Sequence, residues 1–152
     1  HVLPFATNHD AAASFGFRVE SPEGDALGYI TDSGIVTSAA HAALRDVRIL
    51  ALESNHDERM LQSGDYPYVI KQRIASEFGH LSNPQATEEL AALITESRAA
   101  GLRTPEAVVA MHISQNNNDY DLPRAALEKG LAIAEGNARV LCGYQGRLTS
   151  VK

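Results

Sequence analysis

Residues 47–61, VRILALESNHDERML, decide the fold and at the same time raise the question of function. The segment opens with an almost continuous apolar run from Val47 to Leu52, which is typical of a strand buried on both faces. It then delivers two carboxylates, an amide and an imidazole within residues 53–57. Polar groups of this kind are costly to bury without partners, so we expect the end of this strand to form part of a site.

Two other stretches end in the same way. Asp32 closes the apolar part of GYITDSG (28–34), and His112 follows the apolar run of VVAMHISQNNN (108–118). In open α/β sheets, ligands bind outside the carboxyl ends of the strands. We therefore predict that Asp32, Glu53 and His112 form one set at one edge of a sheet.

The remaining pattern indicates an α/β fold with a mixed sheet and flanking helices. A Pro-Gly turn at 22–25 predicts that the second and third strands pair in antiparallel fashion. Asn83 is the predicted cap of the clearest helix, which has Leu90, Leu93 and Ile94 on one face and Gly101 as its stop. The predicted strands are 2–8, 14–21, 26–32, 47–53, 106–114, 138–144 and 147–152, and the predicted helices are 36–44, 57–62, 66–76, 83–101 and 122–136.

Composition narrows the class of protein. With 152 residues the chain is one domain or a piece of a larger one, and it holds no apolar run long enough to cross a membrane. One cysteine, Cys142, excludes an internal disulfide and multi-cysteine zinc motifs, and it favours a cytoplasmic protein. The 19 acidic and 13 basic residues argue against binding nucleic acid by surface charge alone. Bound metal could still supply positive charge for a phosphodiester.

Two further histidines, His9 and His80, lie in predicted loops. Imidazoles together with a carboxylate suit Zn, Mn or Fe. Each residue also has a plain structural interpretation: Asp32 in TDSG as a turn former, a loop histidine bonded to the backbone, and residues 116–118 as a turn and helix cap. His41, in an Ala-rich helix, is interpreted as structural.

In combination, four motifs resemble the second half of a metallo-β-lactamase-fold phosphodiesterase. In chain order they are NHDAAASFGF (8–17), GYITDSG (28–34), GHLSN (79–83) and MHISQNNN (111–118). With ESNHD (53–57) added, the sequence is similar to one branch, the YycJ (WalJ)-like hydrolases, which are regarded as 5′→3′ DNA exonucleases. The resemblance runs from about residue 3 to 145. It implies that residues 1–152 form a single partial domain, the second half of an αββα sandwich.

The resemblance also implies roles for individual residues. His9 would bind one of two divalent metal ions (Zn or Mn), Asp32 would bridge both, and His112 would bind the second. His80 would protonate the leaving oxygen or hold the phosphate, and Glu53 would orient that imidazole. The residues implied in substrate binding are Asn55, His56, Asp57, Ser114 and Asn117.

The sequence departs from this family at its defining motif, since His-x-His-x-Asp-His is absent. In the superfamily that motif belongs to the first half of the domain. Two metals need about six or seven ligands and only three are available, so we expect this chain alone to be inactive and to bind metal weakly. We also expect Leu3, Phe5, Phe15 and Phe17 to be partly uncovered. The missing N-terminal half, or a second copy in a homodimer, would then be a partner.

Three alternatives remain open. A small or cyclic phosphodiesterase of the same fold would share the HLS and TDSG motifs. A non-enzymatic α/β ligand-binding or interaction domain would use its polar strand ends differently. A receiver domain with Asp32 as phospho-acceptor is the weakest alternative, because the first strand ends with Asp10 alone rather than with paired acidic residues.

Overall fold

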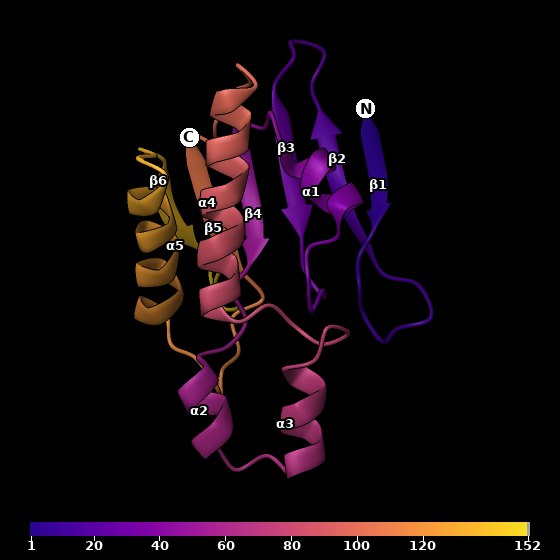
Figure 1. Cartoon of the computed structure of the whole chain (residues 1–152), viewed down its shortest axis with the longest axis vertical. Coiled ribbons are helices and arrows are strands. Elements are labelled where there is room, and N and C mark those ends of the chain that lie inside the picture. Colours follow the sequence, from indigo (N-terminus) through magenta and orange to yellow (C-terminus); the bar gives the residue numbers. More distant parts are fainter. Residues whose placement is uncertain (152) are drawn as a thin grey trace.

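The computed structural model describes residues 1–151 and contains one six-stranded sheet with helices between its strands (Figure 1). The strands lie side by side in chain order. The elements are β1 (Val2–Ala6), β2 (Phe15–Glu20), β3 (Ala26–Ile30), α1 (Ser38–Leu44), β4 (Ile49–Glu53), α2 (Glu58–Ser63), α3 (Tyr68–Ile74), α4 (Asn83–Ala99), β5 (Ala107–Met111), α5 (Asp121–Ile133) and β6 (Arg139–Cys142).

The sheet is mixed, as predicted. The pairs β1–β2 and β2–β3 are antiparallel, which confirms the expected hairpin, and β3 to β6 run parallel to one another. Two antiparallel steps leave β1 running in the same direction as β3. The carboxyl ends of five of the six strands therefore meet at one edge of the sheet, and α2 and α3 lie beyond that edge (Figure 1).

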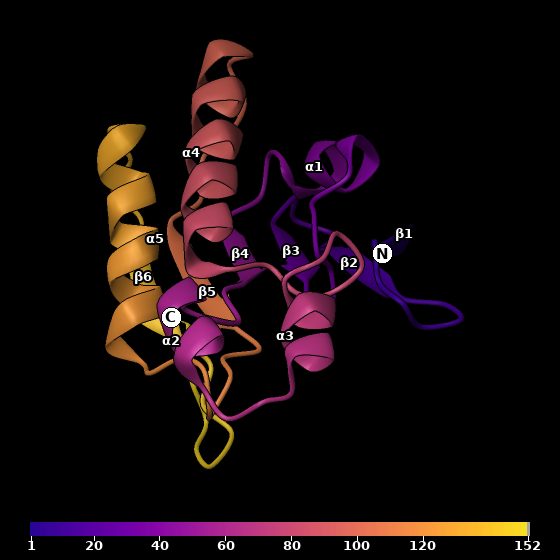
Figure 2. The same cartoon turned by 60° about the horizontal axis from the view of Figure 1, so that its bottom comes forward.

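The helices cover only one face of the sheet (Figure 2). Successive parallel strands are added in one direction, and right-handed crossovers then place every connecting helix on the same side. Helices α1, α4 and α5 occupy that side, and α4 packs along α5.

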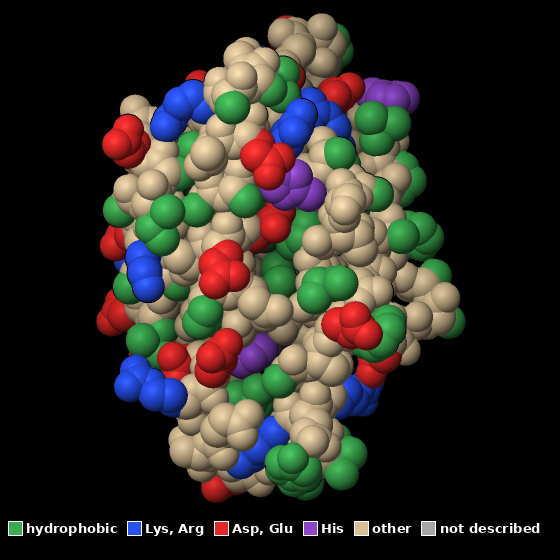
Figure 3. All heavy atoms as spheres, viewed as in Figure 1, with side chains coloured by type: hydrophobic (Ala, Val, Ile, Leu, Met, Phe, Trp, Pro, Cys, Tyr) green, Lys and Arg blue, Asp and Glu red, His purple; other side chains and the backbone are tan. Residues whose placement is uncertain are grey.

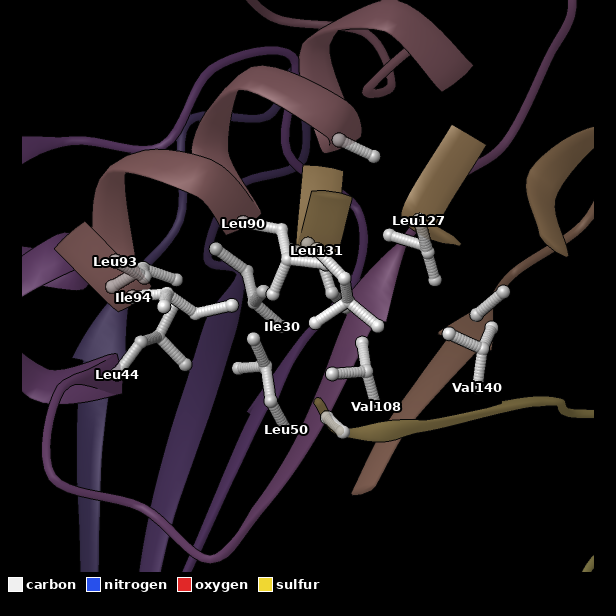
Figure 4. Close-up of a cluster of buried hydrophobic side chains, with 14 of the residues drawn as sticks. Ile30, Leu44, Leu50, Leu90, Leu93, Ile94, Val108, Leu127, Leu131 and Val140 are labelled. Carbon is white, nitrogen blue, oxygen red and sulfur yellow. The ribbon is translucent and has the colours of Figure 1, made fainter. Parts of the chain in front are cut away.

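The core lies between this helix layer and the sheet (Figure 4). Leu50 and Val108 point from the central strands toward the helices and are fully buried. Leu90, Leu93 and Ile94 meet them from α4, with at most 2% exposed, which confirms their predicted shared face. Each such side chain contributes about 1.5–3 kcal/mol when fully buried.

The start of α4 differs from the prediction. Ser82, not Asn83, is the N-cap. Its hydroxyl accepts from the Gln85 amide (3.4 Å), and the Gln85 side chain accepts from the Ser82 amide (2.8 Å), which forms a capping box. This leaves Asn83 as the first helical residue, buried and free to bond elsewhere. The predicted stop is confirmed, since Gly101 has φ +68° just beyond the helix end.

Several strands are shorter than predicted. The first ends at Ala6 rather than 8, the third at Ile30 rather than 32, and the fifth at Met111 rather than 114. The residues that follow the last two strands turn out of the sheet. The predicted final strand at 147–152 is wrong over 147–151, where the chain pairs with no strand, and Lys152 lies outside the described residues.

The sheet face opposite the helices is apolar, and no helix of the described residues packs on it. Phe15 and Phe17 lie on it with 50% and 38% of their surface exposed, next to Val2 at 57%. Leu3 is 42% exposed and Phe5 is half-buried, so both are partly uncovered, as predicted. They do not lie on this face, however, because both pair with even-numbered residues of β2 and point to the helix side, where Phe5 packs over Gly16.

Charged side chains of both signs are scattered over the helix-bearing face, without a large basic patch (Figure 3). This matches the net charge of −6. Among the described residues, no helix combines the length and apolar character that crossing a membrane requires.

Candidate metal centre

The predicted set of polar residues meets at one edge of the sheet. Asp32, Glu53 and His112 stand at or just beyond the ends of β3, β4 and β5, and His9 follows β1. Parallel strand direction explains this convergence, because these carboxyl ends share one edge. His80 arrives from a different source, the segment between α3 and α4.

The five side chains are close enough to act together. The Asp32 Oδ1 atom lies 3.6 Å from His112 Nδ1, 3.8 Å from His80 Nδ1 and 3.9 Å from His9 Nε2. The three imidazoles form a row, with centroids 5.0 Å apart for His9 and His80 and 4.9 Å apart for His80 and His112. One carboxylate thus faces three imidazoles.

The carboxylate of Glu53 holds two of these rings through hydrogen bonds. Its side chain is fully buried, and Oε1 accepts hydrogen bonds from Nδ1 of His80 (2.9 Å) and of His112 (2.8 Å). The backbone amide of Ser33 donates to Oε2 at 3.0 Å. Burial by itself would raise the pKa of the Glu53 carboxyl, but the bonds from His112 and His80 outweigh it and hold the pKa below its usual range.

These bonds define which imidazole nitrogen is free. An ionised carboxylate can only accept, so His80 and His112 carry their protons on Nδ1. His9 donates from Nδ1 to the carbonyl of Gly79 at 3.0 Å, since a carbonyl also only accepts. In the neutral form of His80 and His112, Nε2 is then unprotonated and able to bind metal, and Nε2 of His9 lies 3.5 Å from Asp10 and 3.9 Å from Asp32. A histidine that binds metal through one nitrogen is commonly oriented through the other in this way.

The residues present fit a divalent metal ion. Asp32, Glu53, His80 and His112 offer ligand atoms within 4.8 Å of one another. We favour Nε2 and Asp32 as the ligand atoms, because the Nδ1 atoms and the buried Glu53 already bond to each other. The hydrogen bond that His112 donates to Glu53 also raises the pKa of the His112 imidazole in the metal-free protein, against the opposing effect of partial burial.

Two of the site residues have a strained backbone. Asp32 has φ +55° and His112 has φ +53°, in the left-handed region that residues other than glycine seldom adopt. Each is held by a neighbour: the Ser33 amide bonds to Glu53, and the Asn55 side chain donates to the His112 carbonyl at 2.7 Å. Strain of this kind clusters at functional sites, where the surrounding structure stabilises it.

A cavity of about 320 Å³ opens on this group and is lined in part by His9, Asp32 and His80. Arg73 of α3 forms its rim and donates to Asp10, which holds the pKa of the Asp10 carboxyl below its usual range. Within the lining, this guanidinium is the one side chain that carries a permanent positive charge.

The residues predicted to bind substrate are distributed unevenly. Asn55 and Ser114 line a cavity that adjoins the site and includes His80 and His112. Contact of Asn55 or Ser114 with a substrate stays a prediction.

The other three predicted substrate-binding residues, Asp57, His56 and Asn117, cap a helix or are buried. Asp57 is the N-cap of α2 and accepts from the Met60 amide at 2.9 Å. His56 and Asn117 are 1% and 3% exposed, and burial lowers the pKa of the His56 imidazole so that its neutral form is favoured. A substrate contact for these residues would require rearrangement and stays a prediction.

Sequence reasoning did not predict the contacts made by four residues that shape the site. Arg73 donates a hydrogen bond to Asp10, which lies 63 positions earlier in the sequence, and no local pattern predicts that contact. Asn83 and Asn118 form a buried amide pair. The three consecutive asparagines at 116–118 were a signal, but a run of turn formers does not by itself reveal which one pairs with Asn83.

Comparisons with known proteins identify the class of fold to which this chain belongs. No protein-family model matches the chain. Solved structures with similar folds include the metallo-β-lactamase fold protein YhfI from Bacillus subtilis (TM-score 0.59, 16% identity, 96% of this chain and 47% of that one). They also include Zn²⁺-bound PqqB from Methylobacterium extorquens (TM-score 0.55, 16% identity, 99% and 50%). At such identities the likeness concerns the fold alone, and the chain has the fold of the second half of a metallo-β-lactamase domain.

The sequence relatives are more particular. Exodeoxyribonuclease YycJ of Bacillus anthracis is 32% identical over 139 residues, which cover 88% of this chain and 50% of the relative. Exodeoxyribonuclease WalJ of Streptococcus pneumoniae is 31% identical over 131 residues, 86% and 46%. The chain spans about half the length of these relatives. The predicted resemblance to the YycJ/WalJ-like branch of metallo-β-lactamase-fold hydrolases is confirmed.

Proposed function

We propose that this chain is the C-terminal half of a metal-dependent phosphodiester hydrolase, and that the intact protein is a 5′→3′ DNA exonuclease. The observation that carries the proposal is the row of three imidazoles within 4 Å of Asp32, each anchored through Nδ1. The relatives at 31–32% identity are exodeoxyribonucleases, which favours DNA over a small or cyclic phosphodiester. The anchored rings also argue against a purely non-enzymatic domain.

In this proposal His9, Asp32 and His112 hold two divalent ions, Zn or Mn, together with ligands from the rest of the protein. Bound metal supplies Lewis acidity toward the phosphate. Arg73, at the cavity rim, is placed to approach a phosphate oxygen once it leaves Asp10. The negative net charge of the chain makes such local positive groups the main source of affinity.

His80 carries the proton in the proposed reaction. Its Nδ1 is held by Glu53, which orients the ring. When the ring carries a second proton on Nε2, that proton can pass to the departing oxygen, which leaves the neutral ring with its remaining proton on Nδ1. Glu53 keeps the ring from turning during this transfer.

The apolar sheet face has a proposed partner as well. We propose that an upstream half of the same protein, which would carry the remaining metal ligands, packs on the face that includes Phe15 and Phe17. Its apolar area and the half-length coverage of the relatives support this. A second copy of the chain is the alternative occupant for the isolated chain. Sedimentation that gives a clean monomer at high concentration would count against self-association.

The test is hydrolysis of 5′-labelled DNA, and of a generic phosphodiester, by the purified protein with added Mn²⁺ or Zn²⁺. The proposed cellular location of the reaction is the cytoplasm. The longer protein should be active, Asp32→Asn and His112→Ala should be inactive, and the 152-residue chain alone should be silent. His41→Ala serves as the matched control, because His41 bonds to Glu89 (2.7 Å) on the helix layer. Turnover that survives Asp32→Asn would overturn the proposed site, and robust turnover by the 152-residue chain alone would overturn the half-site proposal.

A further inference from the structure

The three loops that carry the site are joined by buried amide side chains. Residues 54–57 follow β4, residues 80–82 precede α4 and residues 112–118 follow β5. Glu53 ends β4 directly before the first of these loops, and the other two loops hold His80 and His112. The amide side chains of Asn55, Asn83 and Asn118, here called the amide clamp, are at most 8% exposed and link them.

Asn83 and Asn118 bond to each other reciprocally. Asn83 Nδ2 donates to Asn118 Oδ1 (3.0 Å), and Asn118 Nδ2 donates to Asn83 Oδ1 (3.0 Å). Asn118 Nδ2 also lies within bonding distance of the carbonyls of Ser54 (3.1 Å) and Asn55 (3.0 Å). Because carbonyls only accept, these contacts fix which end of the Asn118 amide is nitrogen.

The clamp reaches the site residues directly. Ser54, whose hydroxyl donates to Asn83 Oδ1 at 2.7 Å, is the next residue after Glu53. Asn55 donates from Nδ2 to the carbonyl of His112 at 2.7 Å, and its own carbonyl accepts from the Ser114 amide at 2.9 Å. Asn55 thus holds the chain at the His112 carbonyl and at the Ser114 amide, directly after the strained backbone of His112 at φ +53°.

Because the amide clamp is buried, each of its polar groups needs a hydrogen-bond partner. A buried carbonyl or amide left without a partner costs about 1–3 kcal/mol, so alternative positions of these loops that break the bonds are disfavoured. A loop without these bonds could release the left-handed turn, and the His112 ring would then leave Glu53.

We propose that Asn118, paired with Asn83, and Asn55 are positioning residues that hold Glu53 and His112 in contact, so that His112 keeps its proton on Nδ1 and leaves Nε2 available as a ligand atom. The inference rests on the proposed site but not on the reaction. It assigns the third asparagine of the run at 116–118 a role in aligning the site.

The test is imidazole ¹⁵N spectroscopy of the metal-free protein at alkaline pH, where the rings are neutral and the Nδ1–H and Nε2–H tautomers give separate signals. Wild type should show His112 as the Nδ1–H tautomer. Asn118→Ala and Asn55→Ala should shift it toward the Nε2–H tautomer that a free neutral imidazole favours. Asn55→Ala removes fewer bonds and serves where Asn118→Ala does not fold.

Thr87→Val is the matched control for lost stability. Thr87 is 5% exposed and bonds to the carbonyls of Asn83 (3.1 Å) and Ala126 (2.8 Å), but not to the loops after β4 and β5. It should lower stability and leave the His112 signal unchanged. The proposal is overturned if both asparagine variants keep the wild-type signal, if Thr87→Val shifts it equally, or if wild type shows Nε2–H. Absence of DNA hydrolysis would instead overturn only the proposed function.

Discussion

Replacing Glu53 with Gln is the most direct perturbation of the site. Glu53 uses both carboxylate oxygens, one for His80 and His112 and the other for the amide of Ser33. Glutamine has the same shape but only one acceptor oxygen, so a donor must face its NH₂ group. The Ser33 side of this arrangement is fully buried and has no route to water.

The expected cost follows from that mismatch. One buried donor left unsatisfied costs about 1–3 kcal/mol. Neutralising a buried charge would ordinarily offset part of this cost, but the pKa of Glu53 lies below its usual range, so its partners already outweigh the burial penalty. We therefore expect Glu53→Gln to lower the free energy of unfolding by about 1–3 kcal/mol.

Urea unfolding followed by far-UV circular dichroism measures the change. Glu128→Gln, on the exposed side of α5, is the control and should stay within about 0.5 kcal/mol of wild type. A Glu53→Gln variant as stable as this control, with an unchanged slope against urea, would refute the reasoning that Glu53 is a bonded anchor.

The same comparison has a pH dependence. The lowered pKa of Glu53 means that its contribution is present above about pH 4.5 and is lost as pH falls through the folded pKa. The raised pKa of His112 means that its contribution is present below about pH 6.5 and is lost as pH rises through the folded pKa. The stability difference between wild type and Glu53→Gln should be largest between these limits, and a difference that is constant with pH would contradict the assignment.

Three further predictions concern other parts of the molecule. Asp32→Asn in the longer protein should reduce Mn²⁺-dependent hydrolysis by more than the about 10–100-fold typical of groups that only support a ligand, as measured by initial rates. Ser82→Ala should lower the unfolding free energy by about 1 kcal/mol in urea titrations, because the capping box at α4 is lost. Phe17→Lys should reduce self-association of the isolated chain in sedimentation, since it places a charge on the bare sheet face, whereas an unchanged association state would rule out that face as the contact.

The sequence by itself determined the elements and most of the site. Period-two and period-3.6 patterns located all six strands and the five helices, and polar residues after apolar runs marked Asp32, Glu53 and His112. These signals are local, because a strand that ends in a carboxylate or imidazole shows both features within a few residues. The final predicted strand was wrong, since a short alternating segment such as RLTSVK does not by itself find a pairing partner.

Tertiary structure alone decided how those residues act. Three features depend on contacts across dozens of positions: Glu53 binds two imidazoles at once, Asn118 bonds to the carbonyl of Ser54, and Arg73 bonds to Asp10. The helices gather on one side because crossovers between successive parallel strands share one handedness, and this leaves the opposite apolar face bare. The local sequence shows which polar side chains a segment has. Their hydrogen-bond partners, however, depend on which distant residues the fold brings next to them.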